Sequence, residues 1–409
     1  MDFYQLLTLI LLGMSIIVTV LIYVSNKKLI EKNNVKDSEL ERLKDNMEKC
    51  TEEKNKLKEQ VESLTTIIEG SSYLDKVSTD PKERQPIPPN FDRFEEKVQE
   101  FVKKGGFVKS WDLLKIGNVE YWKSNYNKAL HYNEVVLDQS KNDIELKAAA
   151  LGNIGLIYQE KGKLDKALEY HKKSLGLKKE IGNKLGEATS LGNIGLVYQA
   201  KGDLGKALEY HNQALKLHKE VDYKKGVASS LGNFGLIYQD KGDWDKALEF
   251  YKKAIEIAIK INYKQGEASV LGNIGLVYQA KGDLGKAIDY YNQALKLHKE
   301  IGYKQGEAHA LNNIGEIYRI KKDLDEALKC YNEALKIYKQ IGDEIGIAVI
   351  LHNFGEIHLV KKEYIKALEN ANEAYSVFCK IGYLMKSKET EKLIAKIEQQ
   401  QKQSNQNDN

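Results

Sequence analysis

Amide side chains recur at a fixed spacing from residue 153 onward, and their chemistry suits the binding of a partner. Each asparagine of the series follows the previous one by forty residues, and the first four are each followed six residues later by a glutamine. An amide offers donors and an acceptor, so a row of amides can pair with the main chain of an extended peptide largely regardless of its sequence. The predicted peptide-binding residues are therefore Asn153, Asn193, Asn233, Asn273, Asn313 and Asn353, together with Gln159, Gln199, Gln239 and Gln279.

A second interpretation gives the asparagines a structural role. Each amide would then bond to a neighbouring helix or loop and fix the angle at which successive repeats stack. Asparagine is a poor helix former, so six of them at one helical position need a compensating role. Peptide binding and stacking both supply one, and the sequence leaves the two interpretations open.

The row of amides changes character toward its C-terminal end. Leucines stand three residues after the asparagine in the first four copies, and Glu316 and Glu356 replace them in the last two. Gln279 is succeeded by Arg319 at the glutamine position. The pattern predicts that an apolar ligand segment suits the middle repeats and a charged one the last two, so Glu316, Glu356 and Arg319 join the predicted binding residues.

Other kinds of chemistry find no support in the sequence. It contains no Gly-x-x-x-x-Gly-Lys-Ser/Thr phosphate loop, no nucleophile elbow and no Cys/His spacing typical of zinc. The net charge of +4 comes from 63 basic and 59 acidic residues that are interspersed, which gives no signal for nucleic acid. We therefore expect a protein that is not an enzyme, with no catalytic residues, no metal, no cofactor and no nucleic-acid partner.

The elements that carry the amides are predicted to be pairs of helices. In each copy, Leu-x-Asn-(Ile/Phe)-Gly is followed by apolar residues at helical spacing, then by a turn such as Gly202-Asp203 and a second apolar helical pattern. Gly195, Ala207 and Ala214 have almost no side chain, so they let the two helices approach closely. The second helices are predicted to end at residue types that tolerate positive φ, namely Gly182, Asp222, Asn262, Gly302, Gly342 and Gly382.

These residues carry a resemblance to a known family. Gly195, Tyr198, Gly202, Ala207 and Ala214 fall at the spacing of tetratricopeptide (TPR) repeats, with helices lengthened from 34 to 40 residues per repeat. The longer repeat with Leu-Gly-Asn is similar to spindle-orientation adaptors and, more loosely, to kinesin light chains. The resemblance implies an all-α fold, a right-handed TPR α-solenoid of seven repeats over residues 108–382. It also implies that the first helix of each repeat lines the concave side, where such adaptors hold peptides.

The N-terminal residues are predicted to anchor the chain in a membrane. Residues 3–24 form an uncharged apolar run, long enough as a helix to cross roughly 30 Å of hydrocarbon. Lys27, Lys28 and Lys32 follow the run, which predicts a single-pass protein with its repeats on the cytoplasmic side. A cleaved signal peptide is the competing interpretation, but it requires a basic segment before the apolar run, where this chain has Asp2.

The remaining segments complete the predicted domain organisation. Residues 29–69 carry a short heptad pattern, which predicts a two-stranded coiled coil and hence a homodimer, or else a solitary amphipathic stalk. We expect a proline-containing linker over 70–90, an N-terminal capping helix over 91–107, a C-terminal capping helix over 383–401 and a disordered tail over 402–409. The functional prediction is a membrane-anchored adaptor that binds an extended peptide or helix of a partner protein in its concave groove. The alternative is a structural, self-assembling scaffold without a peptide ligand.

Overall fold

The computed structural model describes residues 45, 48–49, 51–52, 55, 73–79, 87–88, 90–103, 108–140 and 142–407. The chain divides into two compact units, which are described separately. The first comprises Met1–Lys76 with Pro88–Phe107, and the second comprises Val77–Ile87 with Val108–Asn409. The few described residues of the predicted coiled coil are helical, and its pairing stays a prediction because most of residues 29–69 lie outside the described part.

The described chain is all helical apart from its turns, which confirms the predicted all-α solenoid. The helices described are α3 (Phe91–Lys103), α4 (Ser110–Trp122), α5 (Tyr126–Gln139), α6 (Ile144–Glu160), α7 (Leu164–Glu180), α8 (Lys184–Ala200), α9 (Leu204–Glu220), α10 (Lys224–Asp240), α11 (Trp244–Lys260), α12 (Lys264–Ala280), α13 (Leu284–Glu300), α14 (Lys304–Ile320), α15 (Leu324–Ile341), α16 (Glu344–Val360), α17 (Tyr364–Ile381) and α18 (Leu384–Asn407).

The prediction of a fold that includes a membrane-spanning helix is corrected. Residues 3–24, on which it rested, lie outside the described residues, and none of the described helices is both long enough and apolar enough to cross a bilayer. The most apolar of them, α16, is 17 residues long and carries Glu344 and Glu356, whereas the longer α18 is rich in Lys, Glu and Gln. The predictions of a single-pass membrane protein and of repeats on the cytoplasmic side rested on this helix and are corrected with it.

The first unit has a small core of its own around α3. Phe91, Phe94 and Val98 lie on one face of this helix and are buried, because their spacing puts them within one helical stripe. The ring of Tyr73 meets Phe91 edge-on at a centroid distance of 6.1 Å, and Leu74 is buried beside it. This helix lies within the range predicted for the N-terminal capping helix, and its capping role stays a prediction.

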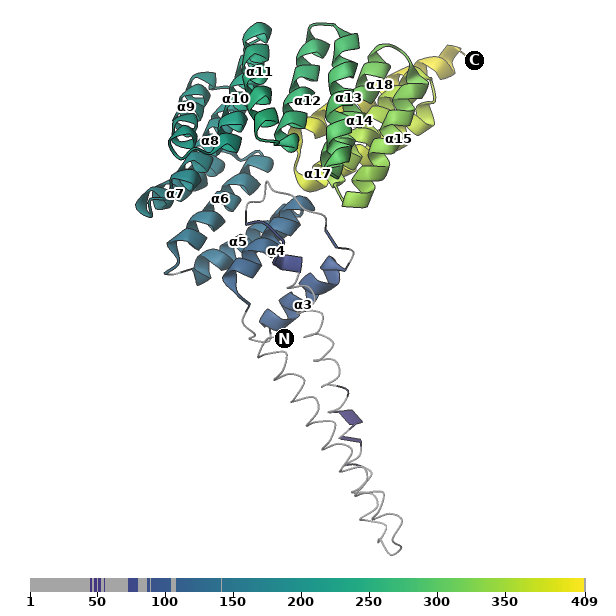
Figure 1. Cartoon of the computed structure of the whole chain (residues 1–409). Helices are drawn as coiled ribbons and strands as arrows, with labels where there is room; N and C mark the ends of the chain where they lie inside the picture. The colour runs from purple at the N-terminus through teal and green to yellow at the C-terminus, as the bar shows by residue number, and fades with distance from the viewer. Residues whose placement is uncertain are drawn as a thin grey trace, which may run out of the picture. The chain divides into compact units, whose positions relative to one another are not determined.

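The second unit is a stack of seven helix hairpins, α4–α5 to α16–α17, followed by α18 (Figure 1). In five of the seven hairpins, the second to the sixth, a glycine of the first helix lies against a ring of the second helix. A Cβ at Gly195 would stand 2.7 Å from the His211 ring, and one at Gly235 only 2.3 Å from the Tyr251 ring. The rings of His211 and Tyr251 are fully buried, so the close helix crossing predicted from the small residues is present.

The turns between helices follow the predicted backbone pattern. All six residues predicted to end the second helices have positive φ, including Asp222 at 51° and Asn262 at 54°. At the turn within a hairpin, the Asp203 carboxylate accepts a hydrogen bond from the Lys206 backbone N–H at 3.0 Å and thereby caps α9. Short reversals of this kind keep successive helices antiparallel and adjacent.

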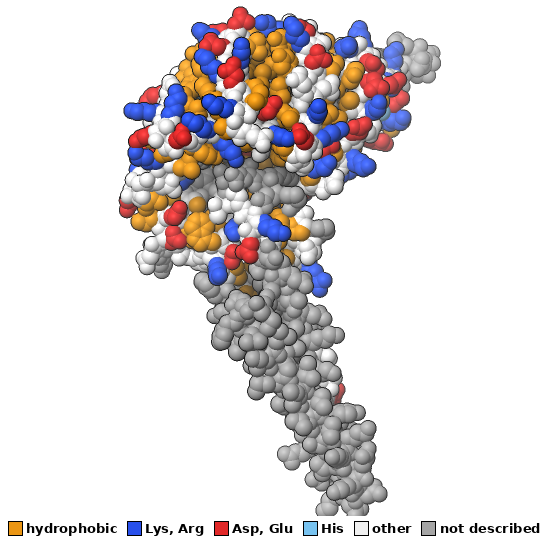
Figure 2. Space-filling view, viewed as in Figure 1, with side chains coloured by type: hydrophobic (Ala, Val, Ile, Leu, Met, Phe, Trp, Pro, Cys, Tyr) orange, Lys and Arg blue, Asp and Glu red, His pale blue; other side chains and the backbone are white. Residues whose placement is uncertain are grey.

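Packing rather than charge holds the hairpins together. Ion pairs link neighbouring hairpins, for example Lys281 with Asp245 at 3.1 Å and Lys361 with Asp325 at 3.0 Å. The aspartates of these pairs are largely exposed and the lysines partly so, and surface ion pairs contribute only about 0–1 kcal/mol each. On the face in Figure 2, side chains of both signs are interspersed with hydrophobic ones over the hairpins.

The stack is curved, and its curvature identifies the inner side. The first helices of successive hairpins contact one another directly, as α4 does with α6, α10 with α12 and α14 with α16. Among the described residues, no two second helices of neighbouring hairpins approach to a comparable extent. The first helices therefore form the inner layer. Ile345 of α16 packs against Tyr126, Ala129 and Ile157, so the seventh hairpin comes back into contact with the first two.

One helix differs in length from its prediction. The last helix, α18, continues to Asn407 and so includes residues 402–407, for which the sequence analysis predicted disorder. This segment is polar but contains neither glycine nor proline, so nothing in it ends the helix.

Alanine substitutions in α12 test the glycine contact. A Cβ at Gly275 would lie 2.5 Å from the Tyr291 ring, so Gly275→Ala should destabilise the fold by about 1–3 kcal/mol. Gly272→Ala is the matched control, because its Cβ meets nothing within 4 Å, and it should stabilise the helix by about 0.5–1 kcal/mol. Urea denaturation followed by circular dichroism measures both. Equal effects of the two changes would show that the ring contact does not matter.

Acid should destabilise the stack through His298. This side chain is 6% exposed, and burial, with the nearby charge of His309, lowers its pKa from 6.5 to about 4. As the pH falls from 6.5 to 4, the unfolded chain binds a proton at this histidine, whereas the folded chain does not. The free energy of unfolding therefore falls by at most about 1.4 kcal/mol per pH unit. His298→Tyr, which copies Tyr338 of the next hairpin, should make the melting temperature less sensitive to pH over that window. An unchanged pH dependence would contradict the assignment.

Candidate functional site

The predicted binding residues lie along the inner layer of the stack. We use the name inner row for the six predicted asparagines and the residues three positions after them, one pair on each of α6, α8, α10, α12, α14 and α16. Residues separated by three positions share one face of a helix, so each pair points the same way. Hydrogen bonds at both ends of the row, from Asn153 to Asn118 and from Asn353 to Asn312, place this face against neighbouring first helices of the inner layer. The members after the asparagines are Leu156, Leu196, Leu236, Leu276, Glu316 and Glu356.

At its N-terminal end the inner row is occupied by the chain itself. The Asn153 amide donates to Asn118 Oδ1 at 2.9 Å, and Asn118 Nδ2 donates to the main-chain carbonyl of Ser78 at 2.9 Å. Asn118 is 1% exposed and Asn153 is 6% exposed, so both amides are used inside the structure. Sequence reasoning missed Asn118, which lies outside the forty-residue spacing of the predicted asparagines.

The middle of the inner row is more open. Asn233 is half-buried and has one long contact of 3.4 Å, from its Nδ2 to His211 Nδ1. Asn273 is half-buried and makes no hydrogen bond to any residue that the structure describes. Leu276 is 36% exposed on the same helix. This stretch therefore combines amides with spare hydrogen-bonding capacity and apolar surface.

The predicted glutamines are partly committed to the hairpins. The buried hydroxyls of Tyr251 and Tyr291 donate to Gln239 and Gln279 at 3.0 and 2.8 Å, respectively. Burial raises the pKa of both tyrosines, so each hydroxyl keeps its proton and remains a donor.

The first two glutamines lack such a donor, because the equivalent ring belongs to a histidine in those hairpins. The side-chain oxygens of Gln159 and Gln199 are buried, and neither has a partner among the described residues. Gln199 Nε2 donates to Asp240 at 2.5 Å. Gln199, Gln239 and Gln279 therefore connect helices, whereas the Gln159 side chain makes no hydrogen bond within the described chain.

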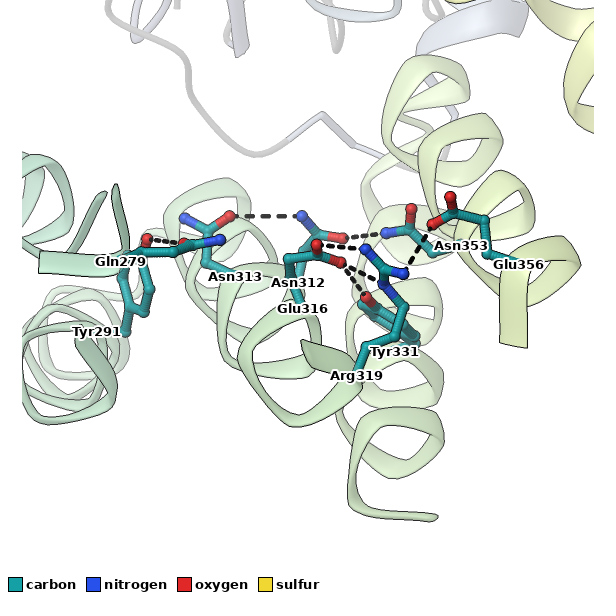
Figure 3. A network of polar contacts seen from close by, with 9 residues as sticks. All are labelled: Gln279, Tyr291, Asn312, Asn313, Glu316, Arg319, Tyr331, Asn353 and Glu356. Carbon is teal, nitrogen blue, oxygen red and sulfur yellow. Dashed lines mark hydrogen bonds and ion pairs between the residues drawn. The ribbon is translucent and has the colours of Figure 1, made fainter. Parts of the chain in front are cut away.

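At the C-terminal end the inner row becomes a charged network (Figure 3). The Arg319 guanidinium donates twice to Glu316, at 2.7 and 2.6 Å, and its third nitrogen lies 3.6 Å from Glu356. The Tyr331 hydroxyl donates to the same Glu316 carboxylate at 3.1 Å. The structure thus brings together the three predicted charged residues and adds Tyr331, which the sequence analysis did not single out.

A separate chain of amides lies beside the charged network (Figure 3). Asn353 Nδ2 donates to Asn312 Oδ1 at 2.9 Å, and Asn312 Nδ2 reaches Asn313 Oδ1 at 3.5 Å. Asn312 was not predicted, although it occupies the position that is glycine in the four preceding repeats. That departure from the repeat was the signal available for finding it.

Comparison with known protein families agrees with the geometry. A family model for the tetratricopeptide repeat matches residues 146–220, 226–300 and 306–380, more than half of the chain. This chain belongs to the TPR family. Each matched segment covers two of the TPR hairpins described above, and together they include α6 to α17 almost without interruption.

Solved structures are similar to this chain at low sequence identity. A Rap protein complexed with competence and sporulation factor is 14% identical, with a TM-score of 0.51, and the match covers 84% of this chain and 99% of that one. NprR in complex with its cognate peptide NprX is 20% identical, with a TM-score of 0.47 and coverage of 69% and 84%.

BtubC from P. vanneervenii is 18% identical, with a TM-score of 0.41 and coverage of 55% and 92%. At such identities, likeness shows fold alone. No curated protein matches the sequence.

Two asparagines of the inner row allow the stacking role to be measured. Asn153→Ala removes a buried amide that bridges α6 to Asn118, so it should lower the free energy of unfolding by about 1–3 kcal/mol. Asn273→Ala removes no hydrogen bond within the described chain and introduces a better helix former, so stability should stay within about 0.5 kcal/mol of the original or rise slightly. Thermal denaturation of the two variants checks this. A loss at Asn273 as large as that at Asn153 would show that the whole row is structural.

Proposed function

We propose that this TPR protein is a non-enzymatic binding module that captures an extended segment of a partner protein along the middle of the inner row. The segment would lie over α10, α12 and α14, with its main chain paired to Asn233, Asn273 and Asn313. Its apolar side chains would pack on Leu236 and Leu276. The proposal limits the predicted site to the asparagines whose hydrogen-bonding groups are not fully used within the chain. It gives the first two asparagines a structural role in the stack.

The observation that carries the proposal is the hydrogen bond from Asn118 to Ser78. There, an amide of a first helix donates to the main-chain carbonyl of a non-helical segment at 2.9 Å. This is the interaction that the proposal requires of the amides further along. A main-chain carbonyl is the same group whichever residue bears it, so recognition of this kind tolerates many sequences.

The glycines beside the middle asparagines support the same conclusion. A Cβ at Gly272 would meet no atom within 4 Å, and one at Gly232 would meet only Val270, at 3.8 Å. These glycines are thus not required by packing within the described part of the chain, although glycine in a helix interior costs about 1 kcal/mol relative to alanine. Open space next to a hydrogen-bonding amide is what the close approach of another main chain needs. The Rap protein above was solved with a bound factor, so a TPR-like stack can hold a ligand.

A scaffold without a ligand is the second candidate, and one observation favours it. At both ends of the row the amides join successive first helices, through Asn153 with Asn118 and Asn353 with Asn312. Amides used in this way set the stacking angle and need no partner. The two candidates differ in what they require of the middle asparagines.

Replacing the middle asparagines separates the candidates. The test variant changes Asn233, Asn273 and Asn313 to alanine in the full chain. The control changes three exposed asparagines of second helices to alanine, Asn212, Asn292 and Asn372. Peptides selected from a random-sequence display library on the unchanged protein should bind the test variant at least about tenfold more weakly, since several main-chain hydrogen bonds of about 1 kcal/mol each are lost. They should bind the control equally well.

Fluorescence anisotropy with the selected peptides, together with melting temperatures, gives the readout. A scaffold without a ligand would yield no selected peptides, or a test variant that loses its cooperative melting. Either result contradicts the proposed function.

A further inference from the structure

Charge is distributed unevenly along the inner row, and this bears on the ligand. The row carries leucine beside its asparagine on α6, α8, α10 and α12, and then glutamate on α14 and α16. In the folded chain, Leu276 is 36% exposed, and the side chains of Glu316 and Glu356 are 27% and 33% exposed. A ligand that lies along the row therefore passes from an apolar surface to one that bears two carboxylates.

The two carboxylates are not equally neutralised. Glu316 receives two hydrogen bonds from Arg319 and one from Tyr331, which satisfies it within the protein. Glu356 has only the 3.6 Å ion pair with the same guanidinium, and no other hydrogen bond or ion pair of its carboxylate is found in the described part of the chain. One guanidinium stands against two carboxylates, so the site keeps about one negative charge, and it resides on Glu356.

Neighbouring groups do not supply the missing positive charge. Burial lowers the pKa of His352, so this imidazole is neutral near pH 7, and its Nδ1 pairs with the Thr390 hydroxyl at 2.9 Å. Lys386 on α18 is paired with Glu389 at 2.5 Å. A partly buried carboxylate with a weak partner gains more from a cation than an exposed one does, because it is less screened by water.

We propose that the segment bound by the inner row carries apolar side chains over α10 and α12 and a lysine or arginine side chain that pairs with Glu356. This inference rests on the proposed function and adds the chemical class of the ligand. Glu356 is then a specificity-determining residue. An acidic side chain at the same place would meet the uncompensated carboxylate and be repelled.

The test uses the full chain and a random-sequence peptide display library. Selections are run on the unchanged protein, on Glu356→Gln and on Glu333→Gln, which removes an exposed carboxylate from a second helix and serves as the matched control. We expect peptides selected on the unchanged protein and on the control to be enriched several-fold in Lys and Arg over the starting library. Glu356→Gln should remove the enrichment while it still selects apolar peptides.

Individual peptides refine the result. Replacing the selected Lys by norleucine keeps the length of the side chain and removes its charge, and should weaken binding to the unchanged protein by about five- to tenfold but leave binding to Glu356→Gln the same. Acetylating the peptide's amino terminus should have little effect. Equal melting temperatures of the three proteins exclude misfolding as the cause of a lost enrichment. If Glu356→Gln destabilises the fold, Glu356→Asp, which keeps the charge, should retain part of the preference for Lys and Arg.

The experiment distinguishes a failure of this charge assignment from a failure of the proposed function. If no peptides are selected on the unchanged protein, the proposed function is wrong and this inference falls with it. If peptides are selected but without basic residues, or with acidic ones, peptide binding stands and the charge assignment is overturned. The charge assignment is also overturned if binding depends on the free amino terminus rather than on the Lys or Arg side chain.

Discussion

The contact between a glycine of one helix and a ring of the next orients most of the hairpins in this structure. In the second to sixth hairpins it holds the two helices close together, and it fixes how the first helix is rotated about its axis. Successive residues of an α-helix are about 100° apart, so the asparagine two positions before the glycine points about 200° away from the ring. The residue pattern that builds the hairpin therefore also presents the amides on the other side, toward the inside of the curve. A substitution that changes the glycine–ring contact would therefore also change the direction in which the amides of the candidate site point.

Much of this arrangement is encoded locally, which is why it could be predicted from the sequence. Asp222 and Asn262 tolerate positive φ, and the turns at these residues depend only on that tolerance. The hairpins depend on apolar residues at helical spacing and on small residues at the crossing. The repeat fold followed from such patterns, because each hairpin contacts mainly its neighbours.

The rest depends on contacts between distant residues, which no local pattern encodes. The bond from Asn118 to Ser78 joins residues forty positions apart, outside the regular repeats. Tyr331 was not predicted, because its hydroxyl matters only through Glu316, which replaces leucine on another helix, α14. The membrane helix was inferred from composition alone, in a segment that makes no part of the described fold. The glutamines were predicted to bind a ligand on their residue type, yet two of them accept hydrogen bonds from tyrosines within their own hairpins.

The contact of Ile345 with the buried cluster of the first two hairpins has a consequence for the curvature of the stack. Apolar side chains from hairpins that are far apart in the sequence are buried together there. Straightening the stack would separate Ile345 from this cluster and expose apolar surface to water, which costs free energy. The curvature is therefore stabilised by a contact between distant hairpins as well as by the contacts between neighbouring ones.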